Sequence, residues 1–410
     1  MKSRNIATFD CETTILNDGS PFTPSNKLCL LGIKDIHGYT TYDIEYSGKP
    51  YGSALKEIKQ RLEAADLVVG FNLKFDLHWI NRYVPDILIR SVFDCQLAEF
   101  LLSFQREVFP SLDGTCNRYE LGSKHDVVKL EYWNNGIDTP LVPLDILEPY
   151  LKQDVELTEK LFNTQKDLLQ GNMRKLFWLQ CQDLIILQEM ERNGLLFDKG
   201  RAAELGKECQ ERLGEIDVLL RQLAGTESIN FNSDDQLSCL LYGGLIPCKY
   251  REVYTRELKS GEVVQRERWS VRYEEMPRLV KPLPRTEGAA TKGMDDDVLQ
   301  RENVVRAEAG KAPIQRLYSV AEPVVRRLRP TKKGKRIIDL LLERAKVAKL
   351  DSTYYTGLIK KMDEHGWEDG YIHGKFNQVV ARTGRLSSSD PNLQNIAGDM
   401  KVLFKSRYAG

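Results

Sequence analysis

Histidine is scarce in this sequence, with only five residues in 410, and none of the eight cysteines belongs to a Cys-x-x-Cys pair. A structural zinc site is therefore not expected, and reduced thiols in a cytoplasmic protein are the simpler interpretation. No apolar run approaches the ~18–20 residues that span a membrane. The N-terminus leads straight into a predicted strand without a signal peptide, so we expect no membrane contact.

Net charge is also absent, because 59 basic residues balance 59 acidic ones. The balance conceals an asymmetry: residues 1–170 are roughly seven units negative and residues 249–336 are roughly nine units positive. A cation-binding acidic part beside a basic stretch suits a phosphate polymer better than a small neutral substrate. The length and the hydrophobic content of 41% predict two or three globular domains.

Asp10 and Glu12 lie two residues apart in a predicted strand over residues 5–12. Alternate side chains of a strand share a face, so the two carboxylates repel each other unless a cation lies between them. A hard divalent cation is the usual partner. The same spacing occurs at Asp43–Glu45 and Asp154–Glu156, so this pair alone is also compatible with charged residues at a strand end.

A second polar pair flanks the turn between a predicted strand over 66–72 and the helix that follows it. Asn72 and Asp76 are placed where side chains project into the crevice at the end of a strand. The alternative is that Asn72 makes the turn and Asp76 caps the helix. Strands that alternate with helices in this part of the chain predict an α/β layer.

A third pair, Tyr150 and Asp154, lies on a strongly patterned predicted helix. Residues four apart on a helix have Cβ atoms within about 6 Å on one face. An ordinary surface pair of tyrosine and aspartate is the alternative. The conjunction of three such pairs in this order favours a shared site.

Together these residues resemble the three motifs of the DEDD superfamily of 3′→5′ exonucleases, and the tyrosine in the third motif marks the tyrosine subtype. The matching segments are Asp10-x-Glu12, Asn72-x-x-Phe75-Asp76 and Tyr150-x-x-x-Asp154. The resemblance implies an α/β RNase H-like exonuclease domain, in which helices flank a mixed sheet. It also implies contacts of Leu16 and Asn72 with the terminal bases.

The resemblance further implies that Asp10, Glu12 and Asp154 hold one Mg²⁺. Asp10 would bridge to a second ion supported by Asp76, with Mn²⁺ as an alternative metal. Paired ions of this kind lie roughly 3.5–4 Å apart. Tyr150 is expected to orient the attacking water, because a phenol with a pKa of about 10 is better suited to orient than to deprotonate.

Residues 381–396, Ala-Arg-Thr-Gly-Arg-Leu-Ser-Ser-Ser-Asp-Pro-Asn-Leu-Gln-Asn-Ile, resemble a signature of the family A DNA polymerases. Segments 191–198 and 230–237 resemble the start of that family's polymerase module, and segment 349–354 resembles its thumb. Arginine and amide side chains can reach acceptor atoms common to all base pairs in the minor groove. The expected contacts with primer and template are Arg382, Arg385, Asn392, Gln394 and Asn395.

Three segments follow from these resemblances: an exonuclease domain at 1–170, a mainly helical thumb region at 171–375, and an incomplete palm at 376–410. The thumb region contains a basic insertion at about 249–336, with short strands expected at Tyr250–Val253 and Val271–Glu274 around a turn at 259–262. The insertion is either a solvated extension or a grip on DNA or a partner. Its basic run falls within 326–336, where phosphate contacts would make affinity strongly dependent on salt.

The predicted function is proofreading, namely magnesium-dependent release of nucleoside monophosphates from DNA 3′ ends by part of a family A polymerase, of bacteriophage type and located in the host cytoplasm. The carboxylate motifs of the polymerase palm are missing, so synthesis is expected to need a second polypeptide or the missing C-terminal part. One alternative is a non-catalytic DNA-binding or assembly subunit of a split polymerase. Another is an RNA-trimming exonuclease that resembles ribonuclease D.

Overall fold

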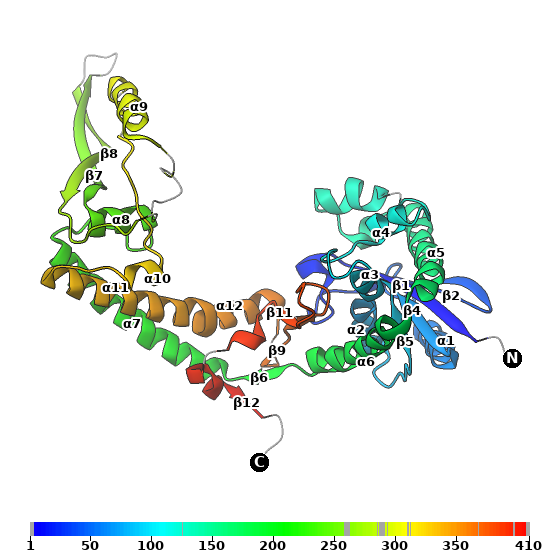
Figure 1. The fold of residues 1–410 in the computed structure, drawn as a ribbon. Helices are drawn as coiled ribbons and strands as arrows, with labels where there is room; N and C mark the ends of the chain where they lie inside the picture. Colours follow the sequence, from blue (N-terminus) through cyan, green and yellow to red (C-terminus); the bar gives the residue numbers. More distant parts are fainter. Residues whose placement is uncertain are drawn as a thin grey trace. The chain divides into compact units, whose positions relative to one another are not determined.

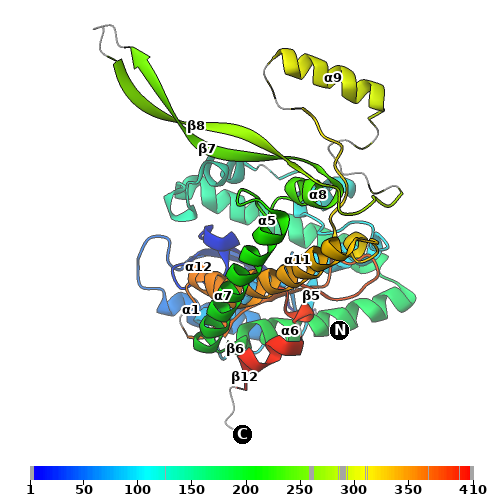
Figure 2. The same cartoon turned by 90° about the vertical axis from the view of Figure 1, so that its left-hand side faces the viewer.

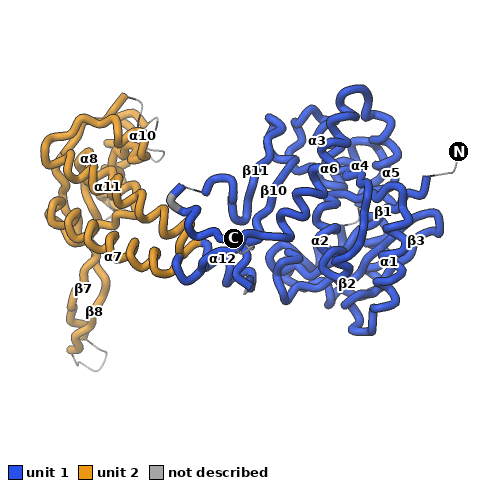
Figure 3. The backbone as a smooth tube through the Cα atoms, turned by 90° about the horizontal axis from the view of Figure 1, so that it is seen from below, with its two compact units in different colours: residues 1–201, 358–410 blue, residues 202–357 orange. Residues whose placement is uncertain are grey.

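Two compact units make up the structure, a computed structural model that describes residues 4–124, 126–257, 263–284, 286, 292, 294–309, 311, 313–367, 369–396 and 398–406. The first unit comprises residues 1–201 and 358–410, and the second comprises residues 202–357 (Figure 3). Each unit has a hydrophobic core of its own. None of the helices in these described ranges combines the length and the apolar character needed to cross a bilayer.

The first unit is built on a five-stranded mixed sheet (Figure 1). Its strands, in spatial order, are β3 (Gly38–Asp43), β2 (Leu28–Asp35), β1 (Ile6–Thr13), β4 (Leu67–Gly70) and β5 (Val92–Asp94). The central strand β1 pairs antiparallel with β2 and parallel with β4. Hydrogen bonds on both sides therefore fix the direction of its side chains. The apolar run at the start of β2 is fully buried, as expected for an inner strand.

Helices surround this sheet and confirm the predicted RNase H-like α/β arrangement. They are α1 (Gly52–Ala64), α2 (Leu73–Tyr83), α3 (Cys95–Leu102), α4 (Leu112–Arg118), α5 (Leu144–Leu168) and α6 (Gly171–Asn193). Short helical turns cover Leu16–Gly19, Val128–Tyr132, Trp133–Asn135 and Thr139–Leu141. Leu147, Leu151 and Val155 of α5 pack on Leu30 of β2, so α5 lies against the central strands.

Helix α6 belongs to the core of the first unit, although residues from 171 onward fall in the second predicted segment. Phe177 of α6 is fully buried, and its ring centroid lies 4.5 Å from that of Phe93 on β5. The helix ends at Asn193, and the following Gly194 adopts a positive φ of 61° that a helix cannot continue through. The compact units consequently divide near residues 201 and 357, whereas the predicted segments divide at 170 and 375.

Residues after 357 also contribute to the first unit. Helix α12 (Thr356–His365) precedes β9 (Tyr371–Ile372), which joins β6 (Leu195–Phe197) and β12 (Phe404–Lys405) in a sheet of order β12-β6-β9. A separate pair is formed by β10 (Lys375–Asn377) and β11 (Ser387–Ser389). Short helical turns cover Leu393–Asn395 and Gly398–Leu403.

The second unit is mainly helical, as predicted for a thumb region. It contains α7 (Lys199–Ala224, which begins in the first unit), α8 (Asp234–Tyr242), α9 (Asp296–Glu308), α10 (Glu322–Val325), α11 (Lys332–Leu350) and a turn at Asp351–Tyr355. The core contains Ile216, Leu240 and Ile337. Arg344 of α11 donates from Nε to Asp217 of α7 at 2.6 Å, and this ion pair ties the two long helices together.

A long two-stranded ribbon extends from these helices (Figure 2). It consists of β7 (Gly244–Glu257) and β8 (Val263–Met276), so the short strands predicted at 250–253 and 271–274 were wrong in length. The two strands pair beyond the predicted segments, through residues many of which are charged. Cross-strand ion pairs such as Arg268 to Glu252 at 2.8 Å stabilise this outer part of the ribbon. The turn predicted at 259–262 lies outside the described residues.

Candidate active site

Three carboxylates meet where the central strand faces helix α5. Asp10 and Glu12 project from β1, and Asp154 projects from α5 one turn after Tyr150. Each of the three carboxylates contributes one oxygen to a group of oxygens that lie within 4.8 Å of one another. Glu12 and Asp154 are buried, and Asp10 is half-buried. The first and third sequence motifs therefore converge in space.

Asp76 lies on α2 next to this cluster and not within it. Its side chain is buried and interacts with the thiol of Cys11, whose side chain alternates with Asp10 and Glu12 along β1. Burial, and then the charge of Asp10, hold the pKa of Asp76 well above its ordinary value. Asp76 does not cap its helix, because the helix begins at Leu73. The fourth predicted carboxylate is thus near enough to Asp10 to interact with it electrostatically.

The cluster concentrates negative charge in a region largely removed from water. Burial raises the pKa of Asp10 to about 7, and the charge of Asp154 adds to this rise. Burial likewise raises the pKa of Asp154 to about 6 and holds that of Glu12 well above its usual range. A cation placed between these groups would remove the repulsion that disfavours their ionised forms.

Lys124 supplies one positive charge to the cluster, and it is not among the predicted site residues. Its ammonium forms an ion pair with Asp154, and it lowers the pKa of both Asp10 and Glu12. The side chain is only 15% exposed. The residue lies in a loop before the turn at Val128–Tyr132, where no periodic pattern relates it to the carboxylates. Only the tertiary structure brings it to the site.

Tyr150 lies beside the cluster with its ring enclosed. The ring centroid is 4.1 Å from Lys124 Nζ and 5.8 Å from the centroid of Trp133. Burial, followed by the charge of Glu12, raises the pKa of Tyr150 far above its ordinary value. The hydroxyl group therefore remains protonated at neutral pH and can donate a hydrogen bond to a water or phosphate oxygen.

The donor set fits a hard divalent cation such as Mg²⁺. All three clustered side chains offer carboxylate oxygens, which are the ligands that Mg²⁺ prefers. In addition, Asp154 Oδ1 is buried and has no hydrogen-bond partner among the described residues. A buried acceptor without a partner costs free energy that coordination to a metal would recover. The site is therefore suited to divalent metal binding.

The two predicted contacts with terminal bases are accessible. Leu16 is 52% exposed. Asn72 is exposed and adopts a left-handed backbone conformation, with φ of 57°, immediately before α2. Asp94 stabilises this turn, because its Oδ2 accepts from the backbone N–H of Leu73 at 2.8 Å. The turn thereby presents Asn72 to solvent.

The predicted contacts with duplex DNA lie on other elements of the same unit. Arg382 and Arg385 precede β11, and Asn392, Gln394 and Asn395 follow it; all five are exposed. Asn392 accepts a hydrogen bond from the backbone N–H of Gln394 at 3.1 Å, which shapes the turn. The structure therefore does not gather these five residues into the carboxylate cluster.

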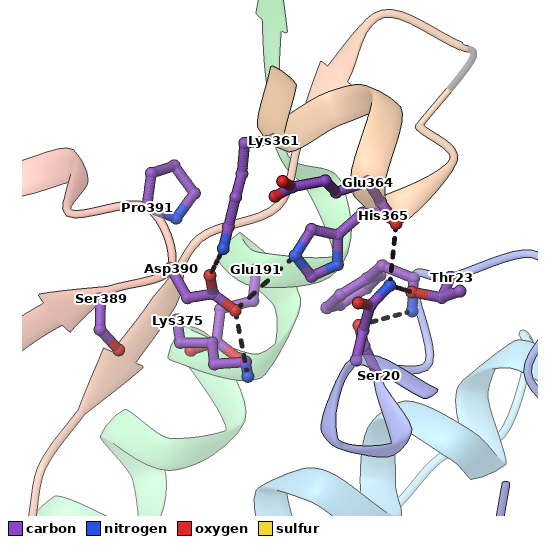
Figure 4. A network of polar contacts seen from close by, with 12 residues as sticks. Ser20, Thr23, Glu191, Lys361, Glu364, His365, Lys375, Ser389, Asp390 and Pro391 are labelled. Carbon is purple, nitrogen blue, oxygen red and sulfur yellow. Dashed lines mark hydrogen bonds and ion pairs between the residues drawn. The ribbon is translucent and has the colours of Figure 1, made fainter. Parts of the chain in front are cut away.

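Asp390 anchors the start of that turn to helix α12 (Figure 4). It forms ion pairs with Lys361 and with Lys375 at 3.4 Å, and its Oδ2 lies 3.8 Å from His365 Nε2. Glu191 of α6 is a buried carboxylate with three polar partners. It accepts from Lys74 Nζ at 2.6 Å, interacts with His78 Nε2 at 2.7 Å and accepts from the backbone N–H of Phe376 at 2.5 Å. Neither Asp390 nor Glu191 is among the predicted site residues.

A carboxylate cluster on the central strand of an RNase H-like sheet defines a metal-dependent nuclease type of site. Comparison with known families agrees: residues 2–170 match the family described as 3'-5' exonuclease, and residues 296–409 match DNA polymerase family A. The chain therefore carries a 3′-5′ exonuclease domain at residues 2–170, and its residues 296–409 are similar to the family A DNA polymerases.

Individual relatives support this assignment. DNA polymerase I of Bacillus subtilis (strain 168) is 27% identical over 293 residues, which cover 71% of this chain and 24% of that protein. DNA polymerase I of Aquifex aeolicus (strain VF5) is 24% identical over 364 residues, which cover 83% and 48%. The chain thus spans between a quarter and a half of the length of these curated relatives.

A solved structure shares the fold. It is described as "POL domain of Pol1 from M. smegmatis complex with DNA primer-template and dNTP", and it matches with a TM-score of 0.58 at 18% identity. The match covers 96% of this chain and 52% of that one.

Proposed function

We propose that this protein is a magnesium-dependent 3′→5′ exonuclease that removes nucleotides from DNA 3′ ends as monophosphates. The observation that carries the proposal is the convergence of Asp10, Glu12 and Asp154, with oxygens within 4.8 Å of one another beside Tyr150. Such a group of buried carboxylates is costly unless it binds a cation. A cation held there would also neutralise the charge of a phosphodiester in the site.

Asp10, Glu12 and Asp154 would hold the metal, and Asp76 would support a second ion near Asp10. We propose Mg²⁺ in both positions, with Mn²⁺ as a substitute. Bound metal supplies Lewis-acid stabilisation of the phosphate and a more acidic water. Tyr150 keeps its proton and donates a hydrogen bond that orients the attacking water. The surrounding burial excludes bulk water and strengthens these polar interactions.

The surroundings of the site support a single-stranded end as substrate. The exposed side chain of Leu16 offers an apolar surface against which a terminal base can pack. Asn72, presented by its left-handed turn, can hydrogen-bond to a base or sugar. An unpaired terminus should be preferred, because a frayed end costs less free energy to withdraw from the duplex.

We further propose that the remaining segments hold primer and template. Arg382, Arg385, Asn392, Gln394 and Asn395 would contact the minor groove of the duplex, and the basic residues within 326–336 would contact phosphates. The sequence does not contain the polymerase carboxylate motifs that the family resemblance implies. We therefore propose that these 410 residues extend a primer only together with a second polypeptide or a further C-terminal part that supplies those motifs.

Digestion of 5′-labelled oligonucleotides tests the proposal. We expect stepwise shortening of single-stranded DNA in Mg²⁺, none in EDTA, and none in Asp10→Ala or Asp76→Ala. Glu156→Gln changes a carboxylate on α5 that is outside the cluster, so it should keep full activity. Full activity in Asp10→Ala would contradict the site.

The same assay separates the two alternatives. Binding of DNA without digestion by the unaltered protein would indicate a non-catalytic DNA-binding subunit. Faster digestion of RNA than of DNA of the same sequence would instead indicate an RNA-trimming enzyme. Each comparison uses identical metal concentrations and a 3′-phosphorylated strand as a blocked-end control.

A further inference from the structure

Lys124 places an ammonium group where the carboxylate cluster would bind a cation. The group forms an ion pair with Asp154 and interacts electrostatically with both Glu12 and Asp10. A single positive charge cannot balance three carboxylates and the phosphate of a substrate. Lys124 therefore does not replace a metal ion. Once metal and DNA occupy the site, the ammonium has to do something other than pair with Asp154.

The loop that carries Lys124 is held firmly in place. The backbone N–H of Lys124 donates to Oδ1 of Asp113, at the start of α4, at 2.8 Å. Gln153 of α5 donates from Nε2 to the carbonyl oxygen of Ser123 at 3.1 Å. These two bonds tie the backbone at residues 123 and 124 to helices α4 and α5, so the position of the lysine backbone does not depend on the ion pair alone.

The side chain itself has freedom that its backbone lacks. Lysine is a point charge on a flexible four-carbon stem, so the ammonium can move by several ångströms while the backbone stays fixed. The ammonium also lies over the Tyr150 ring, 4.1 Å from the ring centroid. A cation over an aromatic face is stabilised there even without a carboxylate partner.

We propose that Lys124 is a further catalytic residue of the exonuclease site: its ammonium pairs with Asp154 in the metal-free protein and transfers to a non-bridging oxygen of the scissile phosphate when metal and DNA bind. This inference rests on the proposed exonuclease function. In the empty site the lysine competes with the metal for Asp154. In the loaded site it stabilises negative charge that develops on the phosphate.

Two variants and one matched control test this role. Lys124→Met keeps the length of the side chain and removes the charge, and Lys124→Arg keeps the charge. Lys152→Met is the control, because Lys152 is exposed on α5 and lies over the Tyr39 ring at 5.8 Å, away from the cluster. Circular dichroism and thermal unfolding show whether each variant folds.

The first measurement is metal binding without DNA, by calorimetric titration with Mn²⁺. Removal of the competing ammonium should tighten Mn²⁺ binding in Lys124→Met by roughly 10-fold or more. This is the size of change in metal affinity that residues in contact with metal ligands produce when they are substituted. Lys152→Met should bind as the unaltered protein does. Weaker binding in Lys124→Met would overturn the proposal and assign the lysine to maintenance of the carboxylate geometry.

The second measurement is the single-turnover rate of digestion at saturating metal. Lys124→Met should be slower by about 10²-fold, the loss typical for one group that stabilises transition-state charge, and Lys124→Arg should recover part of it. An unchanged rate in Lys124→Met would overturn the proposal. If the unaltered protein binds Mn²⁺ but digests no strand, the exonuclease function fails instead, and the titration still decides whether Lys124 competes with metal.

Discussion

Replacement of Asp10 by asparagine should make the metal-free protein more stable while it destroys the proposed activity. Asp10, Glu12 and Asp154 are close together and shielded from water, so ionisation of any one of them is unfavourable in the folded state. Asparagine has nearly the same shape and no charge. The variant therefore removes repulsion from the fold and removes a ligand from the metal site.

The pKa of Asp10 sets the size of the effect. Burial raises this pKa from 3.8 to about 7, and each tenfold change in a protonation constant is worth about 1.4 kcal/mol. Ionised Asp10 thus costs the folded state up to ~4 kcal/mol at pH 8 without metal. A buried amide costs ~1–2 kcal/mol of its own, so the net gain should be ~2–3 kcal/mol.

The gain should depend on pH in a defined direction. Between the unfolded pKa and the folded pKa, the folded protein binds more protons than the unfolded chain, so the stability of the unaltered protein falls as pH rises. The unfolding free energy of the unaltered protein should therefore increase by about 1.4 kcal/mol for each pH unit below 7. Asparagine does not titrate, so Asp10→Asn should lack this contribution at every pH. The advantage of the variant should disappear near pH 5.

Urea unfolding followed by tryptophan fluorescence measures these differences in EDTA. Four of the five tryptophans lie in the first unit, so Trp269→Phe gives a background that reports on that unit alone. Asp167→Asn is the control, because Asp167 is exposed near the end of α5 and should change stability by less than about 0.5 kcal/mol. Mg²⁺ should stabilise the unaltered protein and not Asp10→Asn. A variant no more stable than the parent at pH 8, or one with the same advantage at pH 5 and pH 8, would refute this reasoning.

Three other predictions concern single side chains of the first unit. Arg61→Ala leaves the buried carboxylate of Asp35 without its partner at 2.6 Å and should cost about 3–5 kcal/mol of unfolding free energy, whereas Lys59→Ala breaks a half-exposed pair and should cost less than about 1 kcal/mol. Tyr150→Phe should slow digestion about 10–100-fold and leave Mn²⁺ affinity unchanged, because it removes a group that orients water and no metal ligand; lost Mn²⁺ binding would contradict that role. Glu191→Gln should lower the unfolding free energy by about 2–3 kcal/mol, because two charge-assisted hydrogen bonds are weakened, and a neutral result in urea would show that they contribute nothing.

The parts of the fold that sequence reasoning predicted are those with short-range patterns. The spacing of Asp10 and Glu12 in β1 and that of Tyr150 and Asp154 on α5 both follow from the period of one element. The length of the β7–β8 ribbon does not, because its outer part is held by cross-strand pairs of arginine and glutamate and not by an alternating apolar face. Likewise, nothing local shows that Phe177 packs on the sheet of the first unit.

The residues of the candidate site likewise differ in how well the sequence predicts them. Its carboxylates occupy fixed places on β1 and α5 because metal coordination requires defined directions, and defined directions require regular elements with recognisable spacing. A counter-charge needs only proximity. The ammonium of Lys124, on its long flexible stem, can reach the cluster from a loop that has no regular spacing to any carboxylate. Sequence patterns therefore reveal the carboxylate ligands of such a site more readily than the basic side chains that balance their charge. Those basic neighbours have to be found from the structure.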